Sequence, residues 1–130
     1  MTWFLDSSAI LKLIVDEPES KMLRRFVPTL KITSRISRIE VIRNVHRIDP
    51  KKVARAKAKL DGIYYVELNQ GVLQNAEDIA ITLGIKSLDS IQAGTALFIK
   101  DSIDGVISYD KNLNRALTQL GIYTISPGVF

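Results

Sequence analysis

The chain has 130 residues, and 46% of them are hydrophobic, which suits one domain with a sizeable core and argues against disorder. It has no cysteine and one histidine, so disulfide scaffolds, thiolate metal sites and paired-histidine catalysis are excluded. Its longest uncharged stretch, residues 116–130, is too short and polar for a membrane helix of about 20 apolar residues. The first residues show no basic segment typical of a signal peptide. We expect a soluble, cytoplasmic, single-domain protein over residues 1–130, without membrane association.

Charge is unevenly distributed, although the formal net charge is only +4. Residues 21–59 contain 13 Lys or Arg and two acids, a net charge of +11, whereas the rest of the chain carries −7. Such a basic segment either solvates helices whose long side chains cover apolar surface or forms a surface that follows phosphate groups. Charge alone does not decide between these two interpretations.

Short apolar runs predict five strands, and helical spacing or capping residues predict seven helices. In chain order these are strand 2–5, helix 9–15, helix 18–26 before Pro28, strand 30–33, helix 36–48, helix 50–60, strand 63–68, helix 71–83, helix 87–99, strand 105–109, helix 113–120 and strand 122–125. Ser7 or Ser8 is the expected cap of the first helix, and Ser87 that of the sixth. Because strands alternate with helices, the pattern indicates crossover connections and a mainly parallel sheet of about five strands.

Four acids are placed where such a sheet would bring them to one crevice. Ligands bind outside the carboxyl ends of parallel strands, and Asp6 and Asp110 follow the first and fourth predicted strands. Glu40 lies one turn into the helix after the second strand, and Asp89 lies in the first turn of the sixth helix. If these carboxylates converge, their mutual repulsion favours a bound cation, and an all-oxygen site suits Mg²⁺ or Mn²⁺.

Each acid also has an ordinary structural explanation. Asp6, Asp89 and Asp110 lie at helix starts or turns, where an acid stabilises the free backbone N–H groups. Glu40 could form an ion pair with Arg43 or Arg47 of its helix. Taken singly, each acid is explained better in this way, so the metal site depends on all four acting together.

Blocks of sequence around these acids resemble a known family. They cover residues 6–13 followed by 17–20, residues 34–43 around Glu40, residues 88–97 around Asp89, residues 108–113 around Asp110, and the tail 120–127. They resemble, in this order and over essentially the whole chain, the PIN-domain proteins of the VapC toxin type. The resemblance implies a three-layer α/β/α fold and a divalent-metal-dependent endoribonuclease.

The resemblance also implies roles for individual residues. Carried over by position, the catalytic and metal-binding carboxylates are Asp6, Glu40, Asp89 and Asp110, with Mg²⁺ or Mn²⁺ as cofactor. Ser8 and Ser108 match hydroxyl positions that support the site. Asn112 stands where some family members have a further acid, which would weaken a second metal position.

The expected partners follow from the same resemblance and from the charge pattern. Toxins of this type pair with a small antitoxin, whose basic tail would enter the acidic cleft, and they commonly form homodimers. The RNA strand would be held by cations of the basic segment, namely Arg35, Arg38, Arg43, Arg47, Lys51 and Lys52. Arg35 and Arg38 are favoured because they precede Glu40 by one to two helical turns and so lie nearest the proposed metal site.

Other functions remain as alternatives. A non-catalytic RNA-binding or regulatory domain could retain the same fold. A phosphatase with Asp6 as its nucleophile would need an acid where Ser8 stands. A receiver domain would need an acidic pair before its phosphorylated aspartate, and this sequence shows none.

Overall fold

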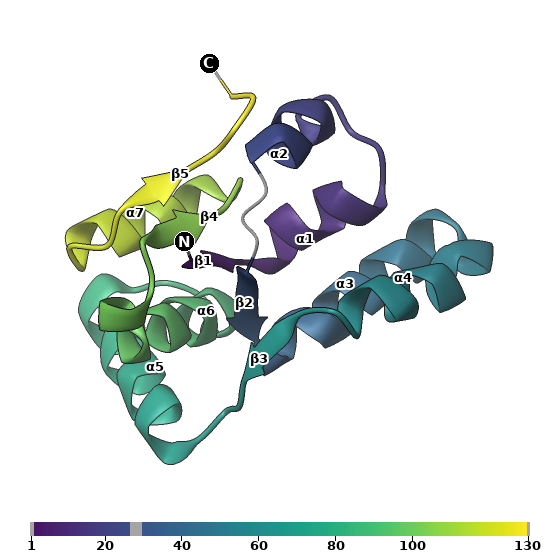
Figure 1. Ribbon diagram of the computed structural model, residues 1–130. Coiled ribbons are helices and arrows are strands. Elements are labelled where there is room, and N and C mark those ends of the chain that lie inside the picture. The colour runs from purple at the N-terminus through teal and green to yellow at the C-terminus, as the bar shows by residue number, and fades with distance from the viewer. Residues whose placement is uncertain (1, 27–29, 130) are drawn as a thin grey trace.

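The computed structural model describes residues 2–26 and 30–129, and it contains a five-stranded sheet in the order β3-β2-β1-β4-β5 (Figure 1). All four strand pairs are parallel, which confirms the predicted sheet. The strands are β1 (Thr2–Leu5), β2 (Leu30–Ser34), β3 (Tyr64–Val66), β4 (Gly105–Ile107) and β5 (Thr124–Ile125). The first strand is therefore central, and β4 is its neighbour although about a hundred residues separate them.

Helices cover both faces of the sheet. They are α1 (Ser7–Ile14), α2 (Ser20–Phe26), α3 (Arg35–Ile48), α4 (Val53–Leu60), α5 (Gln70–Leu83), α6 (Ser87–Phe98) and α7 (Lys111–Gln119), with 3₁₀ turns η1 (Pro50–Lys52) and η2 (Lys100–Ser102). Pro28, expected to follow the second helix, lies outside the described residues. Within residues 2–26 and 30–129, no helix is long and apolar enough to cross a membrane.

Two apolar cores, one on each face, make this a three-layer α/β/α fold. Trp3 and Leu5 pack with buried residues of α1 to α4. Phe4 and Val106, which point to the opposite face, pack with α5, α6 and α7. Successive side chains of β1 thus point to opposite faces of the sheet and pack in both cores, as expected for a central parallel strand.

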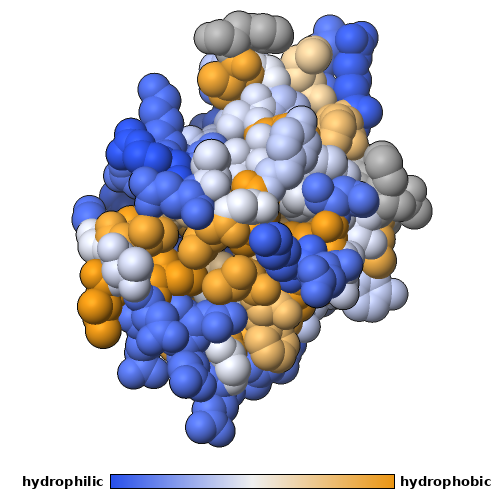
Figure 2. All heavy atoms as spheres, turned by 90° about the vertical axis from the view of Figure 1, so that its left-hand side faces the viewer, coloured by the Kyte–Doolittle hydropathy of each residue, from blue (hydrophilic) through white to orange (hydrophobic). Residues whose placement is uncertain are grey.

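The α5–α6 pair is packed closely enough to require a glycine. A Cβ at Gly94 of α6 would lie 2.8 Å from the backbone nitrogen of Ala76 and 3.0 Å from the backbone oxygen of Val72, both in α5. On their outer side these helices expose large apolar side chains, Leu73, Ile81 and Phe98. Figure 2 shows apolar residues gathered among polar ones on this side of the molecule.

Helix α3 differs from the expectation in its buried face. Its buried residues are Ser37, Val41 and Val45, whereas Ile39 is 64% exposed. The helical spacing of Ile36, Ile39 and Ile42 correctly predicts the helix but not which of its sides is buried, because Ser37 is buried through hydrogen bonds and not through hydrophobicity.

Candidate active site

The site begins where β1 and β4 end side by side. Leu5 pairs with Ile107, so the next residues, Asp6 and Ser108, leave the sheet together. The Asp6 side chain is almost completely enclosed, with 2% of the residue exposed. The Ser108 hydroxyl donates a hydrogen bond to Asp6 Oδ2 at 2.5 Å, and the Ser8 hydroxyl donates one to Oδ1 at 2.6 Å. Both oxygens of this carboxylate are therefore oriented by hydroxyl groups.

Asp6 is also the N-cap of helix α1. Its Oδ1 accepts a hydrogen bond from the backbone N–H of Ala9 at 3.0 Å, so the prediction that Ser7 or Ser8 caps this helix was wrong. Burial raises the pKa of Asp6 to about 6, even though the hydroxyls of Ser108 and Ser8 act in the opposite direction. The charge of nearby Asp110 adds to the rise. The ionised form of this buried acid thus needs further compensation.

Asp110 caps helix α7 and is tied to the same serine. Its Oδ1 accepts hydrogen bonds from the backbone N–H groups of Asn112 at 2.9 Å and Leu113 at 3.1 Å. Its own N–H donates to the Ser108 hydroxyl at 3.1 Å. The cap explains why α7 begins at Lys111, before the predicted start at residue 113, and Asn112 consequently lies in its first turn.

Glu40 is held by a glutamine from another helix. Gln92 Nε2 donates to Glu40 Oε1 at 3.0 Å and to the Ser37 hydroxyl at 2.8 Å. Burial raises the pKa of Glu40, and the charges of Asp89 and Asp110 add to this rise. Among the described residues Glu40 forms no ion pair with an arginine of its own helix, so the alternative of an inert pair with Arg43 was wrong.

The role of Gln92 was missed at the sequence level. It lies three residues after Asp89, one turn along α6, so both side chains project from the same side of the helix. That spacing is the signal that could have identified it. Its Oε1 atom is buried without a hydrogen-bond partner, which leaves an acceptor beside Glu40 for a further donor.

Asp89 lies in the first turn of α6, as predicted. The N-cap of this helix is Lys86, which gives no side-chain cap, so the assignment of Ser87 as the cap was wrong. Burial raises the pKa of Asp89, and Asp110 adds to the rise, whereas Lys86 opposes it.

The four acids influence one another without forming a closed cluster. The charge of Asp110 contributes to the raised pKa of each of the other three, Asp6, Glu40 and Asp89. Within residues 2–26 and 30–129, none of the four forms an ion pair with Lys or Arg. In the same residues, no three His, Asp or Glu side chains are already arranged to hold a metal ion. The acids thus share one electrostatic environment but are not assembled as a ligand set.

A buried lysine, Lys12, contacts the residue that precedes Asp110. Lys12 of α1 is 9% exposed, donates to Glu19 Oε2 at 3.0 Å and lies 4.8 Å from the centroid of the Tyr109 ring. Tyr109 precedes Asp110, and its hydroxyl donates to the Pro127 carbonyl at 2.6 Å. These contacts fix the segment after β4 between α1 and the C-terminal tail.

Within the basic segment, the six cations expected to hold RNA lie in α3 and η1 and fall into two groups. Arg35 makes a forked contact with Glu67, with Nη2 2.6 Å from Oε2, and its guanidinium stacks 4.3 Å from the Tyr65 ring centroid. Arg38 pairs with Asp61 at 3.0 Å. The remaining four are exposed and form no ion pair with the residues that the structure describes; these are Arg43, Arg47, Lys51 and Lys52.

Comparisons with known proteins agree on one family. The model of the PIN domain matches residues 3–117. Two Mycobacterium tuberculosis proteins are similar. Ribonuclease VapC47 (strain CDC 1551 / Oshkosh) is 33% identical over 132 residues, covering 96% of each chain. Ribonuclease VapC46 (strain ATCC 25618 / H37Rv) is 32% identical over 128 residues, covering 95% of this chain and 96% of that protein.

Solved structures share the fold at lower sequence identity. A toxin–antitoxin complex from Klebsiella pneumoniae matches with a TM-score of 0.77 and 15% identity, over 96% of this chain and 97% of that chain. Mycobacterium tuberculosis VapC20, described as a sarcin–ricin loop cleaving toxin, also matches with a TM-score of 0.77, at 14% identity over 98% of this chain and all of the other. The similarity thus extends over whole chains and includes every element that carries an acid of the site.

Proposed function

The chain belongs to the PIN domain family, and we propose that it is a divalent-metal-dependent endoribonuclease that acts as the toxin of a toxin–antitoxin pair. The observation that carries this proposal is the Asp6 carboxylate, which is buried at the end of β1, oriented by Ser8 and Ser108, and not paired with any Lys or Arg of residues 2–26 and 30–129. Relatives named ribonucleases, and a fold shared with toxin–antitoxin structures, support it.

The donor set fits a hard divalent cation. The carboxylates of Asp6, Glu40, Asp89 and Asp110 would hold Mg²⁺ or Mn²⁺, because such ions prefer oxygen ligands. Burial, with the charges of neighbouring acids, raises the pKa values of Asp6, Glu40 and Asp89, and a bound cation would favour their ionised forms. When bound, the ion activates a water molecule and neutralises charge on the phosphate group.

The remaining residues position these acids. Ser8 and Ser108 orient both oxygens of Asp6, and the Ser108 hydroxyl also accepts the N–H of Asp110. Gln92 orients Glu40. Asn112, in the first turn of α7, supplies a neutral amide where a fifth carboxylate would add a charge. We therefore propose a mononuclear site, with phosphodiester hydrolysis that leaves 5′-phosphate and 3′-hydroxyl ends.

The proposed partners are RNA, an antitoxin and a second copy of the chain. The exposed cations of α3, η1 and α4 would hold the RNA strand, since the acidic site itself repels phosphate. An antitoxin tail carrying Arg would bind the acids and exclude the metal, because a guanidinium can grip a carboxylate with two hydrogen bonds. A homodimer is the expected assembly.

The test is RNA cleavage by the wild type and by Asp6→Asn and Asp89→Asn, with Mn²⁺ or with EDTA. Asp101→Asn is a matched control, because Asp101 is exposed in η2. We expect cleavage only with metal, lost in the two site variants and retained in the control, and a metal-induced rise in melting temperature that the site variants lack. Cleavage in EDTA, or full activity of Asp6→Asn, would overturn the proposal.

A non-catalytic RNA-binding domain is the second candidate. It is favoured by the absence, within the described residues, of three acids already arranged around one point. That candidate predicts RNA binding without cleavage and no change in melting temperature on adding Mn²⁺.

A further inference from the structure

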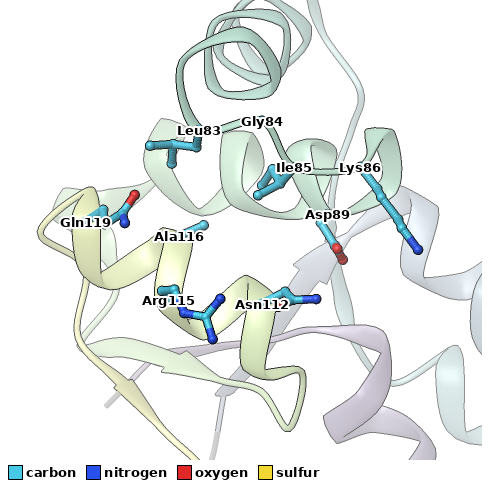
Figure 3. Close-up of a pocket in the computed structure, with 9 residues that line it drawn as sticks. All are labelled: Leu83, Gly84, Ile85, Lys86, Asp89, Asn112, Arg115, Ala116 and Gln119. Atoms are coloured by element: carbon cyan, nitrogen blue, oxygen red, sulfur yellow. The ribbon is translucent and has the colours of Figure 1, made fainter.

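A cavity beside Asp89 has no role in the site described so far. It has a volume of about 320 Å³ and lies between the turn that joins α5 to α6 and the side of helix α7 (Figure 3). The turn contributes Leu83, Gly84, Ile85 and Lys86, and α7 contributes Asn112, Arg115, Ala116 and Gln119. Asp89 also lines it, so the cavity borders the acidic site at this residue.

The cavity carries two cations that are available to a ligand. Arg115 and Lys86 are both exposed, and neither forms an ion pair within residues 2–26 and 30–129. Arg35 and Arg38, by contrast, are already paired with Glu67 and Asp61. Arg115 and Lys86, the unpaired cations that line the cavity with Asp89, therefore lie outside the basic segment.

The other lining groups suit one nucleotide. The amides of Asn112 and Gln119 can each donate and accept hydrogen bonds. Leu83 and Ile85 supply an aliphatic surface against which a flat base can lie. A volume near the lower end of the range for small-ligand pockets, about 300–1,000 Å³, admits a single nucleotide and not a folded RNA element.

We propose that this cavity binds the RNA nucleotide adjacent to the bond that is cut, with Arg115 contacting its phosphate. The inference rests on the proposed function, because only a nuclease site at the four acids requires the RNA strand to run toward Asp89. It places part of the RNA path on α7, at the opposite side of the site from the basic segment. A phosphate contact there would position the strand, and the amides would favour some bases over others.

The experiment compares Arg115→Gln with Arg25→Gln, since Arg25 is also an exposed helical arginine without an ion pair among the described residues. Binding of single-stranded RNA is measured in EDTA at two salt concentrations, so cleavage does not interfere. We expect Arg115→Gln to weaken binding about tenfold and to flatten the salt slope by about 0.7. Arg115→Lys should recover part of the affinity, and Arg25→Gln should change much less.

The outcomes separate this inference from the proposed function. If the wild type cleaves RNA but Arg115→Gln binds and cleaves like Arg25→Gln, the nucleotide subsite is wrong and the nuclease stands. If the wild type binds RNA without cleaving it and Arg115→Gln still loses affinity, the cavity is an RNA-binding site, but the nuclease and the position of the nucleotide beside a cut bond both fail. An acidic peptide serves as a second probe. If Arg115→Gln loses binding to this peptide but binds RNA as the wild type does, the cavity is a site for a protein partner and the nucleotide subsite is overturned.

Discussion

The Ser108 hydroxyl bridges two acids of the site: it donates to the Asp6 carboxylate and accepts the backbone N–H of Asp110. One small side chain therefore fixes the relative position of the end of β1 and the start of α7. Since a hydroxyl has a single proton, acceptance from Asp110 leaves that proton for Asp6. The arrangement needs Asp6 as an acceptor, which is its role when ionised.

Replacing Ser108 by Ala should therefore destabilise the protein more at pH 7 than at pH 5. The variant loses a hydrogen bond to a charged acceptor, about 1.5–3 kcal/mol, when Asp6 is ionised, and a weaker one when Asp6 is protonated. The measurement is urea unfolding at both pH values in EDTA. Ser102→Ala, at an exposed position of η2, is the control and should change little; equal losses at both pH values would contradict the argument.

The buried Asp6 should make stability fall as the pH rises. Its pKa is about 6 in the folded protein and near 4 in the unfolded chain, so the folded state binds the proton more tightly between these values. The free energy of unfolding should decrease by about 2 kcal/mol between pH 4 and pH 7 through this group. Asp6→Asn should remove that part of the slope in urea unfolding with EDTA, and an unchanged slope would refute the assignment.

Within the basic segment, the exposed cations should matter more for RNA than the paired ones. Each phosphate neutralised contributes about −0.7 to the slope of log affinity against log salt. Glu67 and Asp61 already neutralise Arg35 and Arg38. The double variant Arg35→Gln/Arg38→Gln should therefore flatten the salt slope less than the double variant Arg43→Gln/Arg47→Gln.

This expectation reverses the order predicted from the sequence, which favoured Arg35 and Arg38 because they precede Glu40 by one to two helical turns. Binding titrations at two salt concentrations decide between the two orders. A slope unchanged in both double variants would mean that these residues only solvate their helices, with stability effects of a few tenths of a kcal/mol.

Gly94→Ala should destabilise the fold by about 1–3 kcal/mol, because its Cβ would meet backbone atoms of α5 that cannot move independently. This cost exceeds the gain of about 1 kcal/mol in helix propensity. Gly62→Ala is the matched control, since its nearest neighbour, the Lys59 carbonyl, is at an ordinary 3.5 Å. Thermal or urea unfolding compares the two; a neutral Gly94→Ala would show that α5 can shift.

The sequence predicted the alternating fold well because apolar runs and helical spacing are local signals, although the caps assigned to α1 and α6 were wrong. It predicted less about orientation. Ile39 points outward and Ser37 inward, since the polar contacts of Ser37 with Thr33 and Gln92 come from other elements. A prediction from hydropathy does not identify a buried polar residue such as Ser37, whose burial is stabilised by hydrogen bonds.

The candidate site shows the same division. The positions of Asp6 and Asp110 follow from strand ends and could be predicted. The role of Gln92, and the pairing of Arg35 with Glu67, depend on helices and strands distant in sequence. Arg115 was not singled out, because an isolated arginine in an amphipathic helix gives no sequence signal until a cavity lies beside it.

The central position of β1 has a consequence for synthesis. Asp6 leaves the ribosome well before its partner Ser108, which lies 102 positions later in the chain. Until β4 emerges, β1 has an open edge and the Asp6 carboxylate lacks one of its two hydroxyl contacts. A nascent chain therefore carries three of the four acids without an organised site, and an incomplete translation product that stops before Gly105 should be inert toward the cell's own RNA.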